Sequence, residues 1–140
     1  MIGEESAGGD RALLPEASMM TKNILIVDDS PSMRQLVSFA VKDAGYEAIL
    51  AVNGNDALSK LNGTDIDIVI TALNMREMDG VEFIKQFRTR PSCRFTPIVM
   101  LIKESQESKR LEGKKAGASG WIVKPFTPEQ LITVIAKFIR

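Results

Sequence analysis

Short apolar segments alternate with helical patterns from residue 23 to the end of the chain. The apolar segments are rich in β-branched residues and too short for buried helices, which is typical of strands covered on both faces. Alternation of such strands with amphipathic helices predicts repeated βα units on a parallel sheet. The expected strands are 23–27, 46–51, 66–70, 97–102 and 120–124, and the expected helices are 31–44, 53–61, 80–90, 105–116 and 128–138.

Three of the expected helices carry clear start signals. Ser30 precedes Pro31 and can cap the first helix, because a side-chain oxygen satisfies a free N–H and proline suits the first helical position. Asp79 can cap the helix that follows the third strand. Thr127 and Gln130 have the spacing of a capping box for the last helix.

The helix expected at 105–116 is the weakest of the five. Only Leu111 and Ala116 offer apolar contacts, and Gly113 in its middle costs about 1 kcal/mol relative to alanine. We therefore predict that it is the most mobile helix of the domain.

Composition describes an ordinary globular domain. The chain has 140 residues, of which 44% are hydrophobic and 26% charged, and Lys plus Arg equals Asp plus Glu at 18 each. This balance excludes a disordered chain and provides no overall field that would attract nucleic acid or an anionic membrane. Cys93 is the one cysteine and histidine is absent. An internal disulfide and histidine-based chemistry are therefore excluded, and a cytoplasmic location is expected.

The first 20 residues differ from the rest of the chain. They contain acids near the start and only the pair Leu13-Leu14 as apolar content, unlike a secretory signal. We interpret residues 1–20 as a flexible N-terminal extension or a cloning remnant, and 21–140 as the domain. No apolar run is long enough for a membrane span, and the chain ends within the last expected helix, so no separate output domain is expected.

Polar and small residues follow the expected strands at the edge where ligands bind in open parallel sheets. Asp28 and Asp29 come directly after the first strand, and Lys124 closes the fifth. The positions after the third and fourth strands are Ala72, Asn74 and Ile102.

Three sequence runs carry a family resemblance. The runs ILIVDDSPSMR, DIVITALNMREMDG and GASGWIVKPF are similar, in order and spacing, to the receiver domains of response regulators, including the single-domain chemotaxis type. The resemblance covers about residues 22–140. It implies a doubly wound, five-stranded parallel sheet in the flavodoxin-like order 2-1-3-4-5, with helices on both faces. It also implies a two-component signalling module whose partner is a sensor histidine kinase or a downstream target protein.

Several residues match the site of that family. The resemblance implies that Asp28, Asp29 and the backbone carbonyl of Asn74 are magnesium ligands, and that Lys124 binds phosphoryl oxygens. Phosphoryl transfer requires such parts, because a divalent cation and a fixed ammonium neutralise the charge that develops on the phosphoryl group. We expect Lys124 to contact Asp28 or Asp29, and the Lys124–Pro125 bond to be cis.

Other residues depart from the family pattern. Ala72 stands where the family has its phosphate-accepting aspartate, and a methyl group has neither a nucleophilic oxygen nor a lone pair for a metal. Ile102 replaces a hydroxyl residue that contacts the phosphoryl group, and Arg76 replaces a proline. We therefore expect no phosphorylation at residue 72, and a Mg²⁺ affinity below that of an intact receiver.

Two surface features belong to the same resemblance. Trp121 occupies the place of the family's switch aromatic. We predict that its side chain favours one rotamer, because Ile102 fills the space beside it. A tryptophan that is simply packed on its strand is the simpler interpretation. A basic cluster on the weak helix is either a solvated face or a docking patch for an acidic partner. It consists of Lys109, Arg110, Lys114 and Lys115.

The function predicted from the sequence is a receiver that signals through protein contacts without phosphate at residue 72. It is not expected to be an enzyme, to bind nucleic acid or to enter membranes, and it is expected to be a monomer or weak dimer. A second interpretation is an ordinary receiver with an engineered Asp-to-Ala change, although Arg76 and Ile102 would then be unexplained. A third is a small nucleotide- or flavin-binding protein, which the sequence DDSPSMR after the first strand disfavours, because phosphate cradles there need glycines.

Overall fold

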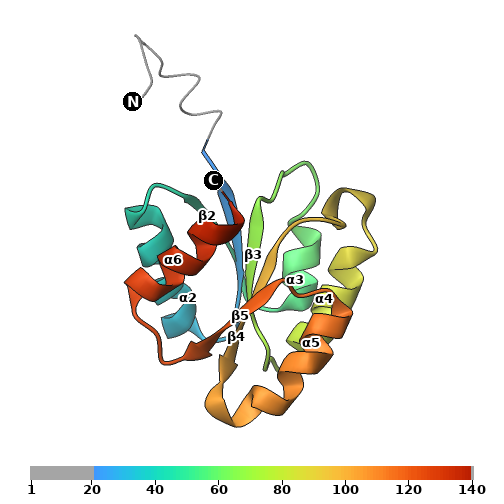
Figure 1. The fold of residues 1–140 in the computed structure, drawn as a ribbon. Coiled ribbons are helices and arrows are strands. Elements are labelled where there is room, and N and C mark those ends of the chain that lie inside the picture. Colours follow the sequence, from blue (N-terminus) through green and yellow to red (C-terminus); the bar gives the residue numbers. More distant parts are fainter. Residues whose placement is uncertain (1–20, 140) are drawn as a thin grey trace.

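A single parallel sheet forms the centre of the computed structural model, which describes residues 21–139. The expected extension at 1–20 lies outside the described residues. All neighbouring strands pair in parallel, in the order β2-β1-β3-β4-β5, which confirms the predicted topology (Figure 1). The strands are β1 (Asn23–Val27), β2 (Glu47–Ala51), β3 (Ile68–Ala72), β4 (Ile98–Lys103) and β5 (Gly120–Lys124).

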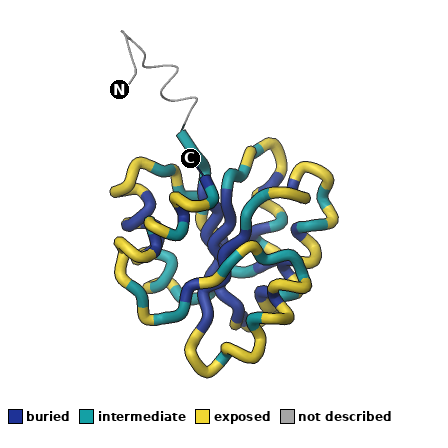
Figure 2. The backbone as a smooth tube through the Cα atoms, in the orientation of Figure 1, coloured by how far each residue is buried: buried dark blue, intermediate teal, exposed yellow. Residues whose placement is uncertain are grey.

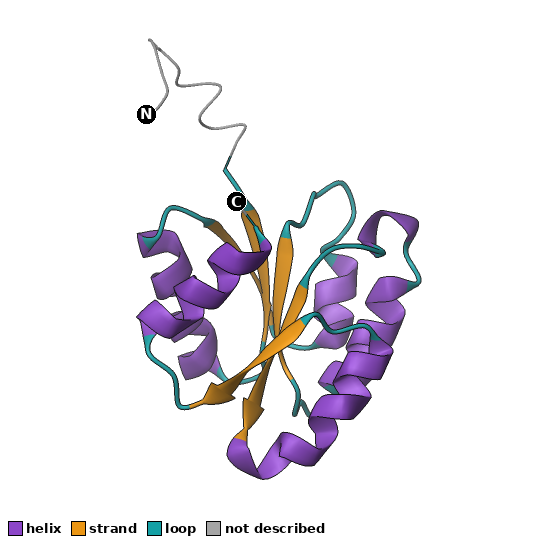
Figure 3. Ribbon diagram, viewed as in Figure 1, coloured by secondary structure: helices purple, strands orange, loops and turns teal. Residues whose placement is uncertain are grey.

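Helices cover both faces of the sheet, so the domain is doubly wound as expected. One face carries α2 (Pro31–Asp43) and α6 (Pro128–Phe138), and the other carries the remaining three helices (Figures 1 and 3). These are α3 (Gly54–Ser59), α4 (Gly80–Arg88) and α5 (Arg110–Ala116), and short 3-10 helices occur at η1 (Pro91–Cys93) and η2 (Glu104–Lys109). No helix between residues 21 and 139 is long and apolar enough to cross a bilayer.

The core has two layers, one on each side of the sheet. Successive side chains of a strand point to opposite faces, so Leu25 of β1 packs toward α3, α4 and α5, whereas Ile24 and Ile26 pack toward α2 and α6. The central strands are buried on both faces (Figure 2). This double burial is the physical reason why the strands read as continuous apolar runs.

The predicted helix starts are all present. Ser30 Oγ accepts a hydrogen bond from the Met33 N–H at 3.3 Å, and Asp79 Oδ1 accepts one from the Glu82 N–H at 2.9 Å. Thr127 and Gln130 form the reciprocal capping box at the start of α6. These local signals were sufficient because a cap depends only on residues within one turn of the helix.

The weak helix differs from the prediction. Its first half is the 3-10 helix η2, and only Arg110–Ala116 is α-helical. Gly113 has a packing role, because a Cβ at this position would collide with the side chain of Met100 in β4, 2.5 Å from its Cε atom. The glycine that weakens α5 in isolation therefore allows the helix to approach the sheet closely.

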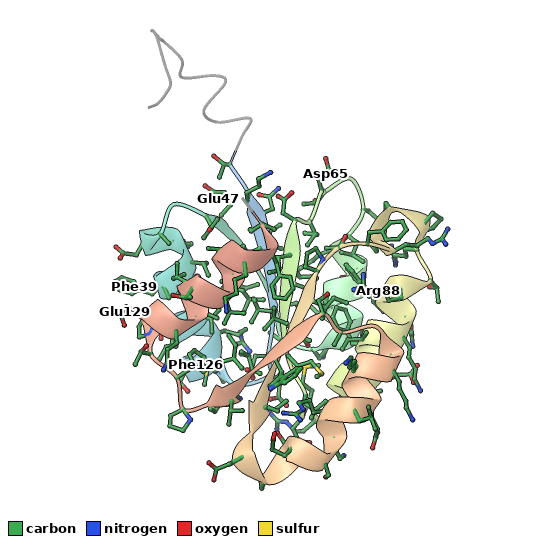
Figure 4. All side chains as sticks on the ribbon, in the orientation of Figure 1. Phe39, Glu47, Asp65, Arg88, Phe126 and Glu129 are labelled. Carbon is green, nitrogen blue, oxygen red and sulfur yellow. The ribbon has the colours of Figure 1, made fainter. Side chains whose placement is uncertain are left out.

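Two further close contacts hold the loops on this face. The Gly80 N–H donates to the Leu73 carbonyl at 2.8 Å, which ties the start of α4 to the end of β3. The guanidinium of Arg88 lies between the helices of the same face (Figure 4), and donates to the carbonyl oxygens of Gly117 and Cys93, each at 2.7 Å. Partly buried carbonyls of two segments thus share one charged donor.

Candidate functional site

A cavity of about 630 Å³ lies at the carboxyl ends of β1, β3, β4 and β5. The structure brings four of the predicted site residues together in its lining, namely Asp28, Asp29, Asn74 and Lys124. It places the other three, Ala72, Ile102 and Trp121, outside that lining. The convergence follows from the fold, because parallel strands deliver their carboxyl ends to one edge of the sheet.

Asp28 is the most unusual side chain of the cavity. Its residue is 2% exposed, and Oδ1 accepts a hydrogen bond from the Ser30 N–H at 2.9 Å. Among the residues that the structure describes, none donates a hydrogen bond to its buried Oδ2 atom. Burial raises the pKa of Asp28, an effect that the Ser30 N–H and the Lys124 charge oppose. A buried carboxylate oxygen without a donor is costly, so a partner for this atom is chemically favoured.

Lys124 approaches this unsatisfied oxygen. Its Nζ atom lies 3.9 Å from Asp28 Oδ2, which is the contact expected from the sequence but too long for a hydrogen bond. The Lys124–Pro125 peptide bond is cis, as predicted. Lys124 therefore stabilises the Asp28 carboxylate electrostatically but donates no hydrogen bond to Oδ2.

Asp29 has a different partner. Its Oδ2 atom accepts a hydrogen bond from the Arg76 N–H at 3.2 Å, and Arg76 Nε lies 3.5 Å from the same oxygen. Arg76 departs from the family pattern, and its ion pair with Asp29 was not predicted from the sequence. No sequence signal could have found it, because the two residues are far apart in the chain and belong to different loops.

Lys103 is a cavity residue that the sequence analysis missed. The prediction ended β4 at Ile102, whereas the strand includes Lys103, which pairs in register with Lys124 of β5. Both lysines line the cavity. The signal was present, because a lysine directly after an apolar strand was the reason for selecting Lys124.

Ala72 and Ile102 belong to the core. Ala72 ends β3 and is buried, and Ile102 is fully buried in the cluster on the α3, α4 and α5 side of the sheet. Neither side chain carries a polar atom. At these two strand ends the molecule presents hydrocarbon where the family resemblance implies a carboxylate and a hydroxyl.

Trp121 lies on β5 away from the cavity. The residue is 39% exposed, and the guanidinium carbon of Arg110 stands 4.3 Å from the centroid of its ring. Glu107 holds that guanidinium with contacts of 3.0 and 3.1 Å. The half-exposed tryptophan thus has a cation stacked on its face.

The donor set of the cavity suits a hard divalent cation only in part. Asp28 Oδ2 lacks a donor, Asp29 is a second carboxylate, and Asn74 lines the same cavity, which fits the preference of Mg²⁺ for oxygen. Between residues 21 and 139, however, no group of three acidic, cysteine or histidine side chains could hold a metal. The residues therefore fit Mg²⁺ in part, because Asp28, Asp29 and the Asn74 carbonyl would hold the ion and water would supply the remaining ligands.

The comparison with known proteins agrees with this geometry. The family model described as the response regulator receiver domain matches residues 24–136. The chain belongs to this family. The match includes every strand of the sheet from Ile24 onward and the elements that line the cavity.

Individual relatives of this receiver domain include chemotaxis proteins. The chain is 37% identical over 110 residues to the chemotaxis protein CheY1 of Helicobacter pylori, covering 77% of this chain and 89% of that protein. It is 36% identical over 117 residues to CheY-3 of Vibrio cholerae, covering 81% and 90%. The structure of the chemotaxis response regulator CheY4 of Vibrio cholerae superposes with a TM-score of 0.81 at 43% identity, covering 86% of this chain and all of that one. The chain is therefore a CheY-like two-component signalling domain.

Proposed function

We propose that this receiver domain signals by protein contact without accepting a phosphoryl group at residue 72. The end of β3 carries the proposal, because Ala72 offers a buried methyl group at the position where the family resemblance implies the acceptor aspartate. A phosphoryl group bonds to a nucleophilic oxygen, and a methyl side chain has none.

The rest of the cavity supports the same proposal. Its acidic side chains are Asp28 and Asp29, and each lies beside a cation of the protein. Ile102 has no hydroxyl with which to draw the loop after β4 toward a phosphoryl oxygen. A receiver with this cavity retains the scaffold of its family and lacks two of the groups that react to phosphate.

Mg²⁺ binding remains part of the proposal, at lower affinity than in an intact receiver. Asp28, Asp29 and the carbonyl of Asn74 would hold the ion, which would supply positive charge to the cavity. Loss of a third carboxylate weakens the site, because the affinity of hard cations rises with the number of charged ligands.

The partners proposed for the domain are a sensor histidine kinase or a downstream target protein. The chemotaxis relatives support a protein partner. We propose a cytoplasmic location and a monomer or weak dimer, in which contacts of the folded domain carry the signal.

Backbone amide spectra test the proposal directly. Mg²⁺ added to ¹⁵N-labelled protein is expected to shift the amides of Asp28, Asp29 and Asn74, because these residues surround the cavity. A small phosphodonor such as acetyl phosphate, added afterwards, is expected to cause no further change. A second set of peaks for Thr71, Ala72 and the Trp121 indole, dependent on both Mg²⁺ and the phosphodonor, would show that the domain responds to phosphate.

A further inference from the structure

We propose that Arg76 is a built-in cation of the acidic pair, and that it competes with a divalent metal for Asp29. This inference rests on the proposed function in one respect, because it takes the site to contain two carboxylates rather than three. It goes further by assigning a role to an arginine that the family resemblance does not assign.

Two contacts from one residue hold the Asp29 carboxylate. The Arg76 N–H donates to Asp29 Oδ2 at 3.2 Å, and Arg76 Nε lies 3.5 Å from the same atom. The Arg76 side chain is 87% exposed, so the ion pair alone would be weak in water. The backbone hydrogen bond compensates for this weakness, because it keeps the start of the side chain beside the carboxylate.

The pair stands between two cavities. Asp29 and Arg76 both line the 630 Å³ cavity and also a neighbouring cavity of about 290 Å³. Glu77, the next residue, accepts a hydrogen bond from Asn53 Nδ2 at 3.2 Å and is thereby engaged elsewhere. Arg76 therefore forms its ion pair with Asp29 at a position where both residues line both cavities.

Each carboxylate of this region already has a cation of the protein beside it. Lys124 lies beside Asp28 and Arg76 lies beside Asp29, and Lys103 adds a third cationic side chain to the cavity lining. A divalent ion that binds both carboxylates must approach the guanidinium closely and displace it from Asp29. Repulsion between a unit charge and a divalent ion about 4 Å away opposes this step, even in a medium close to water.

Metal titrations of charge variants test the role of Arg76. Mg²⁺ is titrated calorimetrically into the parent protein, Arg76→Ala and Arg76→Lys at one ionic strength. Arg94→Ala is the matched control, because it removes the same charge from an arginine that stacks on Phe95 and does not line either cavity. Circular dichroism melts verify that each variant folds as the parent does, which is expected for so exposed a side chain as Arg76.

We expect Arg76→Ala to bind Mg²⁺ about tenfold more tightly than the parent, Arg76→Lys to lie closer to the parent, and Arg94→Ala to match the parent. Equal Mg²⁺ affinities of Arg76→Ala and the parent would overturn the proposal, and so would the absence of detectable Mg²⁺ binding to both proteins. An increase in Mg²⁺ affinity in Arg94→Ala equal to that in Arg76→Ala would overturn it as well. The proposed function fails on a different result, namely phosphorylation of the parent, which leaves the order of Mg²⁺ affinities unaffected.

Discussion

Replacement of Asp28 by asparagine is expected to stabilise the folded protein at neutral pH. The buried Oδ2 atom lacks a hydrogen-bond donor among the described residues. The negative charge of the Asp28 carboxylate is removed from water, because the residue is buried. Asparagine keeps an oxygen for the Ser30 N–H and eliminates the buried charge. The substitution therefore removes a cost of folding while retaining the local turn.

The magnitude follows from two opposing effects. At an effective dielectric constant near 20, the attraction of Lys124 at 3.9 Å contributes about 4 kcal/mol. Desolvation of a buried ion costs several kcal/mol. The raised pKa of Asp28 means that desolvation, together with repulsion from Asp29, exceeds the favourable contributions of the Ser30 N–H, Lys124 and Arg34. We therefore expect Asp28→Asn to increase the free energy of unfolding by about 1–2 kcal/mol.

The pH dependence has a definite sign. Because the pKa of Asp28 in the folded protein is raised above its ordinary value of 3.8, the folded state binds more protons than the unfolded state in this window. Stability is thus lost as pH rises from 3.8 through the raised pKa, and the loss persists at neutral pH. The advantage of Asp28→Asn should be absent below this window and complete above it.

Urea denaturation without divalent ions, followed by circular dichroism, measures the effect at neutral and at acidic pH. Asp29→Asn is the matched control, because Asp29 is partly exposed and has Arg76 as a partner. It should change stability by no more than about 0.5 kcal/mol. An Asp28→Asn protein that is less stable than the parent at neutral pH would show that the buried carboxylate is well compensated in the folded protein.

Three further substitutions probe the packing and the tryptophan. Gly80→Ala should destabilise the domain by about 2–3 kcal/mol in urea denaturation, because its Cβ would collide with the Ala72 carbonyl and stand 2.9 Å from Leu73 Cα. Gly113→Ala should lose less stability, because its Cβ meets only the movable side chain of Met100. A larger loss in Gly113→Ala than in Gly80→Ala would contradict this prediction. Arg110→Ala should lower the free energy of unfolding by about 0.5–1 kcal/mol, because the cation stacked on Trp121 is lost. It should also shift the fluorescence of Trp121 to the red and increase its quenching by acrylamide. An unchanged spectrum would show that the stacking is unimportant.

The fold was largely predictable from the sequence because its signals are local. Runs such as NILIV in β1 are apolar on both faces, and caps such as Ser30 and Thr127 act within one turn. The errors occurred where local and tertiary preferences conflict. Ile66 lies outside β3 although it continues the apolar pattern, and η2 replaces the first half of an expected α-helix.

Part of the cavity lining and one of its two ion pairs, Lys124 with Asp28, were predictable from the sequence. The rule that strand ends converge identified Asp28, Asp29 and Lys124, whose carboxylates and ammonium indeed line one cavity. The contact between Arg76 and Asp29 depends on how two loops fold over each other, which spacing along the chain does not encode. The absent donor at Asp28 Oδ2 likewise depends on the full set of neighbours in three dimensions.

Intact mass spectrometry after incubation with acetyl phosphate and Mg²⁺ distinguishes a domain that cannot be phosphorylated at residue 72 from one that accepts phosphate there. The parent protein and Ala72→Asp are treated side by side, since the variant restores only the missing carboxylate. We predict that Ala72→Asp gains one labile phosphoryl group and that the mass of the parent stays unchanged. A parent protein that gains one phosphoryl group, located by fragmentation in the segment 68–79, would show that the domain accepts phosphate without an aspartate at residue 72.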